Sequence, residues 1–329
     1  MHIPLLIKLF PVILILLIAE MIYSYRENRE LYLFKDTLNN LMIGVTYFAS
    51  NAISKVTFFA AISWMSRFHV ISLGNSWWVW LLCFMGNDFT FYIYHKAAHE
   101  INWLWASHAT HHSSEKLNIT TAFRQSWTTN ITGHFVFWLW MPFLGFSPEM
   151  IMIVSQLSFL YQYLLHSETI GRLPAFIEFI FNTPSHHRVH HSSNPEYLDK
   201  NHGGVLIIWD RIFGTYCDEN TKPVYGLTEK LKSGNPVIIV FSSWNDLFQK
   251  AFRSGSVKNF ISYFIMPPGW SHDGSSCTVK QARDQKCNRR KTVRLADMFH
   301  SEPNPDPPVD GRNNNSIVPI AIGILKLAK

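Results

Sequence analysis

Charged residues are scarce in this sequence. Asp, Glu, Lys and Arg make up 16% of the 329 residues, whereas soluble domains carry about 25%. Hydrophobic residues reach 47% and aromatic residues 15%. A chain of this composition cannot cover its whole surface with charge, which excludes a disordered, collagen-like or nucleic-acid-binding protein. The net charge of +6 is spread along the chain and suits an anionic lipid surface better.

Several familiar site signatures are also missing. The four cysteines lie far apart without a CxxC pair, so neither a disulfide scaffold nor a cysteine zinc site is indicated. The sequence has no GxGxxG or GxxxxGK[ST] motif for a nucleotide and no GxSxG motif of a serine hydrolase. It also lacks the HExxH motif that pairs a zinc ion with a general base. We therefore expect neither a nucleic acid nor a nucleotide as partner.

Long apolar stretches predict an all-α fold, a multi-span transmembrane helical bundle with a cytosolic His-rich metal-binding cap. Four apolar tracts are candidate membrane spans, the last as a hairpin that turns at Pro148: 9–23, 41–64, 76–94 and 134–165. The basic loop 24–38 is placed in the cytosol by the positive-inside rule. With the spans in this order, the chain emerges on the cytosolic side both after residue 94 and after residue 165.

The same features divide the chain into four parts. Residues 1–75 are predicted to hold the N-terminal spans, and 76–235 to form the catalytic membrane and cytosolic region. Residues 236–300 are predicted to be a polar cytosolic segment. The Pro- and Asn-rich residues that begin 301–329 predict a disordered linker, and the apolar stub that follows is too short to span a bilayer.

Histidine is the residue type that stands out. Eleven of the 16 histidines lie between His95 and His191. Eight of the eleven form one HxxxH and two HxxHH clusters, with the members His95, His99, His108, His111, His112, His187, His190 and His191. Spacings of three and four residues place imidazoles on one face of a helix. His166 directly follows the apolar hairpin and is a ninth candidate ligand, whereas His186 and His202 are not assigned to a metal.

This number of imidazoles predicts two metal ions, because zinc takes four ligands at most. Imidazole suits zinc, copper, iron or nickel. Without a general-base Glu, O₂ activation by iron is favoured over hydrolysis by zinc. Carboxylates that could orient the rings are Glu100 and Asp88, followed by Glu115, Glu168 and Asp199. A zinc transporter or metal-storage protein is the alternative from another class, although transporters bind their ions at mid-membrane.

The three clusters on a multi-span chain resemble the fatty acid hydroxylase/sterol desaturase superfamily of integral-membrane diiron oxygenases. Longer stretches are similar to its members that oxidise alkylglycerols: AHEINWLWASHATHHSSEKLNITTAFRQS (98–126), NTPSHHRVHHSSNPEYLDKNHGGVLIIWDRIFGTY (182–216) and VYGLT (224–228). The resemblance extends from about residue 75 to residue 230. An inactive relative would have lost ligands, and none of the eight is missing.

The resemblance implies a multi-pass enzyme of the endoplasmic reticulum membrane whose His clusters face the cytosol. With two iron ions, O₂ and tetrahydrobiopterin, it would hydroxylate the ether-bearing carbon of an alkylglycerol or a lyso-ether-phospholipid, giving a fatty aldehyde and a glycerol derivative. The eight clustered histidines would be iron ligands and Glu100 an essential carboxylate, while His202 stands where this family has Tyr. The alternative is a sterol desaturase, a sterol methyl oxidase or a fatty acid hydroxylase that receives electrons from cytochrome b5.

Overall fold

The computed structural model describes residues 5–231 and 233–284, without the side chains of 5–10 and 51–53. Within these residues the chain is helical, and its β-type pairings are two isolated bridges. The all-α class predicted from the sequence is therefore confirmed. The predicted linker and stub, 301–329, lie outside the described residues, and the predicted division into four parts stays a prediction.

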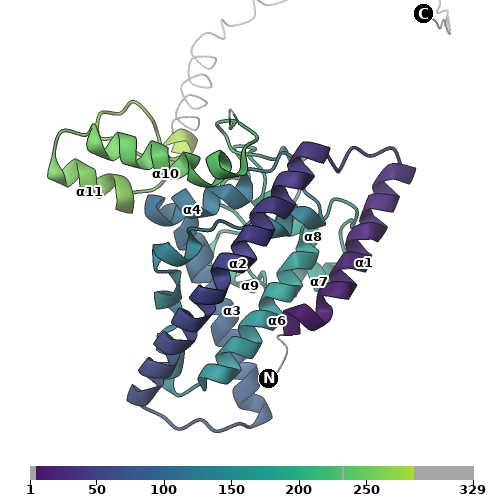
Figure 1. Cartoon of the computed structure of the whole chain (residues 1–329), viewed down its shortest axis with the longest axis vertical. Helices are drawn as coiled ribbons and strands as arrows, with labels where there is room; N and C mark the ends of the chain where they lie inside the picture. Colours follow the sequence, from purple (N-terminus) through teal and green to yellow (C-terminus); the bar gives the residue numbers. More distant parts are fainter. Residues whose placement is uncertain (1–4, 232, 285–329) are drawn as a thin grey trace, which may run out of the picture. The chain divides into compact units, whose positions relative to one another are not determined.

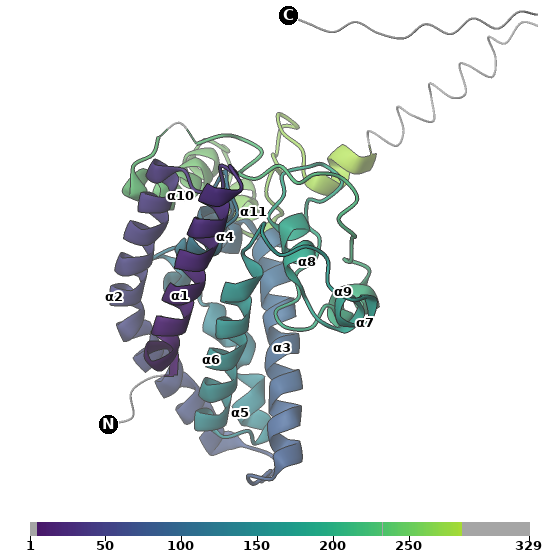
Figure 2. The same ribbon diagram turned by 90° about the vertical axis from the view of Figure 1, so that its right-hand side faces the viewer.

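Four long helices lie side by side (Figure 1, Figure 2): α1 (Leu5–Arg26), α2 (Phe34–Met65), α3 (Trp77–Glu100) and α6 (Pro148–Leu165). α2 runs in the opposite direction to the other three, so the loop after α1 meets the ends of α3 and α6 at one end of the bundle. Hydrogen bonds tie this end together, because the Glu20 carboxylate accepts from the Ser167 hydroxyl (2.5 Å) and from the Ile119 backbone N–H (2.9 Å).

Shorter helices cover the same end of the bundle: α4 (Asn102–His112), α7 (Ala175–Ile180), α8 (Pro184–His190), α9 (Ile208–Phe213), α10 (Pro236–Phe252) and α11 (Val257–Ile265). α10 and α11 pack on α4 through a buried cluster that includes Ala106, Trp244 and Leu247. Pro184 occupies the first position of α8, where its missing N–H costs no helical hydrogen bond. These packed short helices fix the His-rich segments.

The tract 134–165 forms the predicted hairpin, with a short first arm. That arm consists of the 3₁₀ helix η4 (His134–Trp138) and of α5 (Trp140–Leu144), and α6 is the second arm. The chain turns at Gly145, directly before the Ser147 cap and Pro148 of α6. Gly145 has a φ of 105°, and a Cβ atom there would collide with the carbonyl oxygen of Ile71, so the turn requires glycine.

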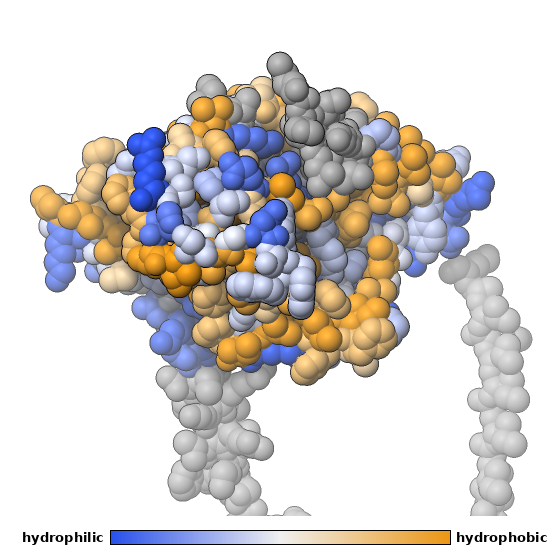
Figure 3. All heavy atoms as spheres, turned by 90° about the horizontal axis from the view of Figure 1, so that it is seen from below, coloured by the Kyte–Doolittle hydropathy of each residue, from blue (hydrophilic) through white to orange (hydrophobic). Residues whose placement is uncertain are grey.

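No helix within residues 5–231 and 233–284 has both the length and the apolar composition required to cross a membrane. The membrane spans predicted from the sequence therefore stay a prediction. Large apolar side chains are nevertheless exposed along the long helices, among them Ile15 (65% exposed), Val45 (69%) and Val56 (70%). Figure 3 shows hydrophobic side chains over much of the face seen from below.

Candidate metal centre

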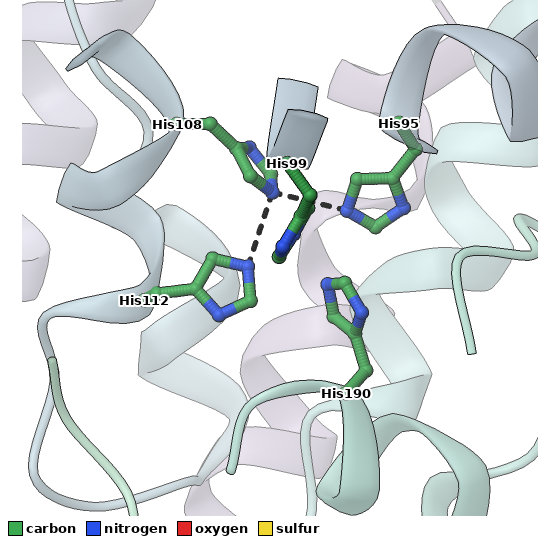
Figure 4. Close-up of side chains that lie close together, drawn as sticks. All are labelled: His95, His99, His108, His112 and His190. Carbon is green, nitrogen blue, oxygen red and sulfur yellow. Dashed lines mark hydrogen bonds between the residues drawn. The ribbon is translucent and has the colours of Figure 1, made fainter. Parts of the chain in front are cut away.

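Nine histidines converge at the end of the bundle where α3, α4, α6 and α8 meet. The structure brings together all nine ligands predicted from the sequence, in two groups whose ligand nitrogens lie within 4.8 Å of one another. The five-histidine group contains His95, His99, His108, His112 and His190, and the four-histidine group contains His111, His166, His187 and His191. The five rings of the first group surround one point (Figure 4). Whether these residues ligate a metal stays a prediction.

Helix geometry divides each HxxHH cluster between the two groups. His108 and His112 lie four residues apart on α4 and share the five-histidine group, whereas His111 is turned by about 100° and joins the other group. On α8 the division is reversed, because His187 belongs to the four-histidine group and His190 to the five-histidine group. Both helices therefore contribute to both groups.

The two groups are neighbours. The ring centroids of His112 and His191 are 4.5 Å apart, those of His111 and His112 5.6 Å, and those of His187 and His190 5.4 Å. His111 and His191 belong to the four-histidine group, and His112 and His190 to the five-histidine group. Rings of one group thus contact rings of the other, as a two-metal centre requires.

Backbone carbonyls orient three of the rings. The Nδ1 atoms of His95, His166 and His190 contact the carbonyl oxygens of His202 (2.9 Å), Gln162 (2.9 Å) and Lys200 (3.0 Å). A carbonyl oxygen can only accept, so each Nδ1 carries the proton and donates it. The Nε2 atom of each ring is left with a free lone pair. Metal-binding histidines are typically oriented in this way.

The inward-facing nitrogens fit a cation better than a hydrogen-bonded network. Nε2 of His95 lies 3.0 Å from Nε2 of His108, and Nε2 of His166 lies 3.0 Å from Nε2 of His187. Nε2 of His190 is buried and has no hydrogen-bond partner among the described residues. Buried polar atoms seldom lack a partner, and a bound cation would satisfy these lone pairs together. The donor set of neutral imidazoles fits zinc, copper, iron or nickel.

Eight of the nine rings are held neutral by their surroundings, as metal ligands must be. Burial lowers the pKa of His95 to about 3 and that of His166 to about 4. Burial, together with the neighbouring rings, holds the pKa of six further histidines well below the usual value: His108, His111, His112, His187, His190 and His191. At neutral pH these imidazoles carry no charge that would repel a cation.

Among the predicted carboxylates, Asp199 approaches the rings most closely. Its Oδ1 lies 3.4 Å from Nδ1 of His99. Glu100, the predicted essential carboxylate, is half-exposed, and its carboxylate accepts from Nζ of Lys96 at 2.5 Å. It is not among the residues of either histidine group. The structure therefore places Glu100 at the rim of the site, and its predicted role stays a prediction.

The other two lower-ranked carboxylates have partners other than the histidine rings. Glu115 pairs with Lys230 at 3.6 Å on the surface. Glu168 accepts from the backbone N–H of Leu117 at 3.4 Å. Neither is a member of a histidine group.

Two buried carboxylates hold the loop that orients His95. Asp88 on α3 accepts from the backbone N–H groups of Val205 (2.7 Å) and Leu206 (3.1 Å), and also from Nε1 of Trp209 (3.0 Å). Asp210 accepts from the backbone N–H groups of His202 (2.8 Å) and Gly203 (2.7 Å). Both carboxylates thereby fix the loop whose His202 carbonyl binds Nδ1 of His95. Asp88 acts on the site through this loop and does not touch a histidine ring directly.

Two arginines fasten the helices that carry the HxxHH clusters. Arg124, which is 2% exposed, donates from Nε to the Thr110 carbonyl (3.2 Å) at the end of α4 and from Nη1 to Asp36 of α2 (2.8 Å). Arg188 on α8 donates to both carboxylate oxygens of Glu219 at 2.7 Å. Sequence reasoning did not single out either arginine, although both lie within the stretches that carry the resemblance.

Gln125 is a further residue that the sequence did not indicate. Its Nε2 lies 3.2 Å from Nδ1 of His111 and 3.2 Å from the carbonyl oxygen of Ala122. No sequence spacing could have revealed the side-chain amide of Gln125 beside this ring.

His186 lies outside both groups, with its Nε2 3.0 Å from the carboxylate of Glu178.

Both histidine groups open onto one cavity of about 220 Å³. His95 and His108 of the first group and His111, His166 and His187 of the second line it. The rest of the wall comes mainly from α2, α3, η4 and α6, and its aromatic part consists of Tyr47, Phe48, Phe58, Phe91, Tyr94, Trp138, Phe159 and Tyr163. A largely apolar cavity that ends on a polar, histidine-rich surface is typical of a site for an apolar substrate.

The sequence of this chain is similar to those of several known proteins. Residues 80–215 match the family described as fatty acid hydroxylase. The chain is 38% identical to the alkylglycerol monooxygenase of Xenopus tropicalis over 258 residues, which cover 78% of this chain and 57% of that protein. It is 43% identical to the alkylglycerol monooxygenase of Homo sapiens over 197 residues, 60% of this chain and 43% of that protein.

A more distant similarity reaches a bacterial enzyme. The ornithine lipid hydroxylase of Rhizobium tropici is 31% identical over 166 residues, which are 45% of each chain. No solved structure matches the chain. The chain spans about half the length of the curated relatives that it matches.

Proposed function

We propose that the chain is a membrane diiron monooxygenase, dependent on tetrahydrobiopterin, that acts on alkylglycerols or lyso-ether-phospholipids. The match of residues 80–215 to the fatty acid hydroxylase family and the similarity to alkylglycerol monooxygenases support this proposal. The enzyme would insert one oxygen atom of O₂ at the ether-bearing carbon of the alkyl chain. The product then separates into a fatty aldehyde and a glycerol derivative.

The observation that carries this proposal is that one cavity reaches both histidine groups. Its lining follows α6 from His166 to Met152, and fourteen helical residues extend over about 21 Å. A long apolar space of this kind suits an alkyl chain, and its histidine end is where the carbon to be oxidised has to lie. The relatives named as alkylglycerol monooxygenases support an ether lipid as the substrate.

The protein's own contribution is positioning and exclusion of water. Nine imidazoles would hold two iron ions, which supply O₂ activation when bound, and tetrahydrobiopterin would supply the electrons. The aromatic wall formed by residues such as Phe91, Tyr94 and Trp138 keeps the reacting carbon away from bulk water. Carbonyls that bind Nδ1 of His95, His166 and His190 keep the rings in place throughout the reaction.

We further propose a location in the endoplasmic reticulum membrane, with the histidine end facing the cytosol. The bundle exposes apolar side chains along α1 and α2, and basic residues, among them Arg26 and Arg29, lie at the histidine end. Basic residues favour the cytosolic side. A bilayer around the bundle would deliver the lipid substrate directly to the cavity.

The test uses microsomes that contain the full chain, an alkylglycerol and O₂, with and without tetrahydrobiopterin. We expect fatty aldehyde to form only with the pterin, and we expect His111→Ala to abolish its formation. His69→Ala is the matched control, because His69 is exposed and belongs to neither group. Wild-type rates in His111→Ala would contradict the site assignment. Turnover supported by cytochrome b5 and not by the pterin would instead favour a sterol or fatty-acyl oxidase.

A further inference from the structure

A tenth imidazole lies against the five-histidine group. His202 belongs to the loop that Asp210 fixes, and its side chain is 1% exposed. Its ring centroid is 4.9 Å from that of His99 and 5.7 Å from those of His95 and His190. Contacting ring centroids within the five-histidine group are themselves 4.3 to 6.4 Å apart. The ring of His202 therefore packs against that group at the same spacing as its members, while its nitrogens lie outside the set of ligand atoms within 4.8 Å of one another.

The hydrogen bonding of His202 leaves one nitrogen without a partner. The backbone carbonyl of Asp199 interacts with the ring, and Nδ1 is buried and has no hydrogen-bond partner among the described residues. The nitrogen that donates to Asp199 is therefore Nε2, which leaves an unshared lone pair on Nδ1. An unsatisfied lone pair in a buried site costs stability unless something binds it.

We propose that His202 is a further metal-binding residue of the five-histidine group, through its Nδ1 atom. This inference rests on the proposal that the two groups hold metal ions. With His202 the first group offers six imidazoles, and the second group offers four.

The two histidine groups also differ in how many of their residues line the cavity. Three of the four histidines in the second group line it, namely His111, His166 and His187. Only His95 and His108 of the first group do so, and His202 is not among the lining residues. A first site filled by six imidazoles leaves the four-histidine group as the one with positions free for small ligands. One ion would then have a purely structural role, and the other would face the cavity with open positions.

The test compares metal binding by the full chain and by His202→Ala, with cobalt(II) as the probe and without turnover. We expect both proteins to bind two ions, but one ion to bind about 10- to 100-fold more weakly in His202→Ala. The visible absorption of bound cobalt should rise in the variant, because cobalt with fewer than six ligands absorbs more strongly. Added imidazole should enter the vacated space and restore both the affinity and the spectrum.

His186→Ala is the matched control, because His186 is equally buried but pairs with Glu178 outside both groups. We expect it to leave the cobalt affinities and the spectrum unchanged. If His202→Ala does not fold, His202→Gln keeps a polar side chain and should show the same loss in smaller measure. Unchanged affinities and spectra in the His202 variants would overturn the inference. Failure of the wild-type chain to bind two ions would instead overturn the proposed metal centre.

Discussion

Arg124 is the residue whose removal we expect to test the architecture of the site most sharply. Its guanidinium group joins the end of α4, directly after His112, to the beginning of α2. It donates to the Thr110 carbonyl (3.2 Å) and to the side chains of Ser113 (2.9 Å), Asp36 (2.8 Å) and Asn40 (2.8 Å). A cation at this position also interacts favourably with the carboxyl end of the α4 dipole.

Replacement of Arg124 by Ala removes all these contacts and leaves the largely buried Asp36 carboxylate without its cationic partner. Breaking a buried ion pair in this way costs about 3–5 kcal/mol in the free energy of unfolding. One kcal/mol shifts Tm by about 2–4 °C in a protein of 150–250 residues, so we expect a loss of about 6–20 °C. Arg124→Lys keeps the charge but not the planar fork of donors, and it should lose about half as much.

The assay is thermal unfolding of the purified full chain, followed together with its metal content. Arg253→Ala is the matched control, because Arg253 is exposed at the end of α10 and far from the histidines in sequence. We expect the control to melt within 1–2 °C of wild type, as surface substitutions do. If Arg124→Ala also melts within that range and keeps its metal, then Arg124 does not fasten α4, and our reading of this network is wrong.

Three further predictions follow from the site. The free energy of unfolding of the metal-free protein should fall as the pH is lowered from about 7 to 5. Histidines of the unfolded chain take up protons below their usual pKa of 6.5, whereas buried His95 has a pKa of about 3 and stays neutral. Melting curves recorded across this pH range test the direction of the change. Glu100→Gln should abolish aldehyde release if the resemblance assigns its role correctly, whereas Asp199→Asn should weaken metal binding through His99, and measuring turnover and metal content for each separates the two. Ser158→Trp should fill the cavity and block turnover with the metal retained, whereas Leu157→Trp, one residue away on the exposed face of α6, should have little effect on either.

The sequence predicted those parts of the site that consist of side chains at helical spacing. Apolar tracts located the long helices, although α2 begins at Phe34, before the apolar run at 41–64. The eight clustered histidines could be found because imidazoles three and four residues apart are rare by chance. His166 could be found because it directly follows the apolar residues that form α6.

The remaining features depend on tertiary packing and have no local signature. The rotation of α4 about its axis decides that His111 and His112 face different groups. The acceptors for Nδ1 of His95 and His190 are backbone carbonyls, which every residue type provides. Asp88 was a candidate for a direct contact with a ring, but it reaches the site through a loop 117 residues later in the chain. Such contacts follow from how distant segments meet.

The sharing of α4 and α8 between the two histidine groups makes their occupancies interdependent. A cation bound to His108 and His112 restrains the rotation of α4, and His111 moves with the same helix. On α8, His187 and His190 are joined in the same way. The first ion to bind therefore bears most of the ordering entropy, and the second finds its ligands already arranged. Loading should accordingly be cooperative, so that partly metallated molecules are rare at every metal concentration.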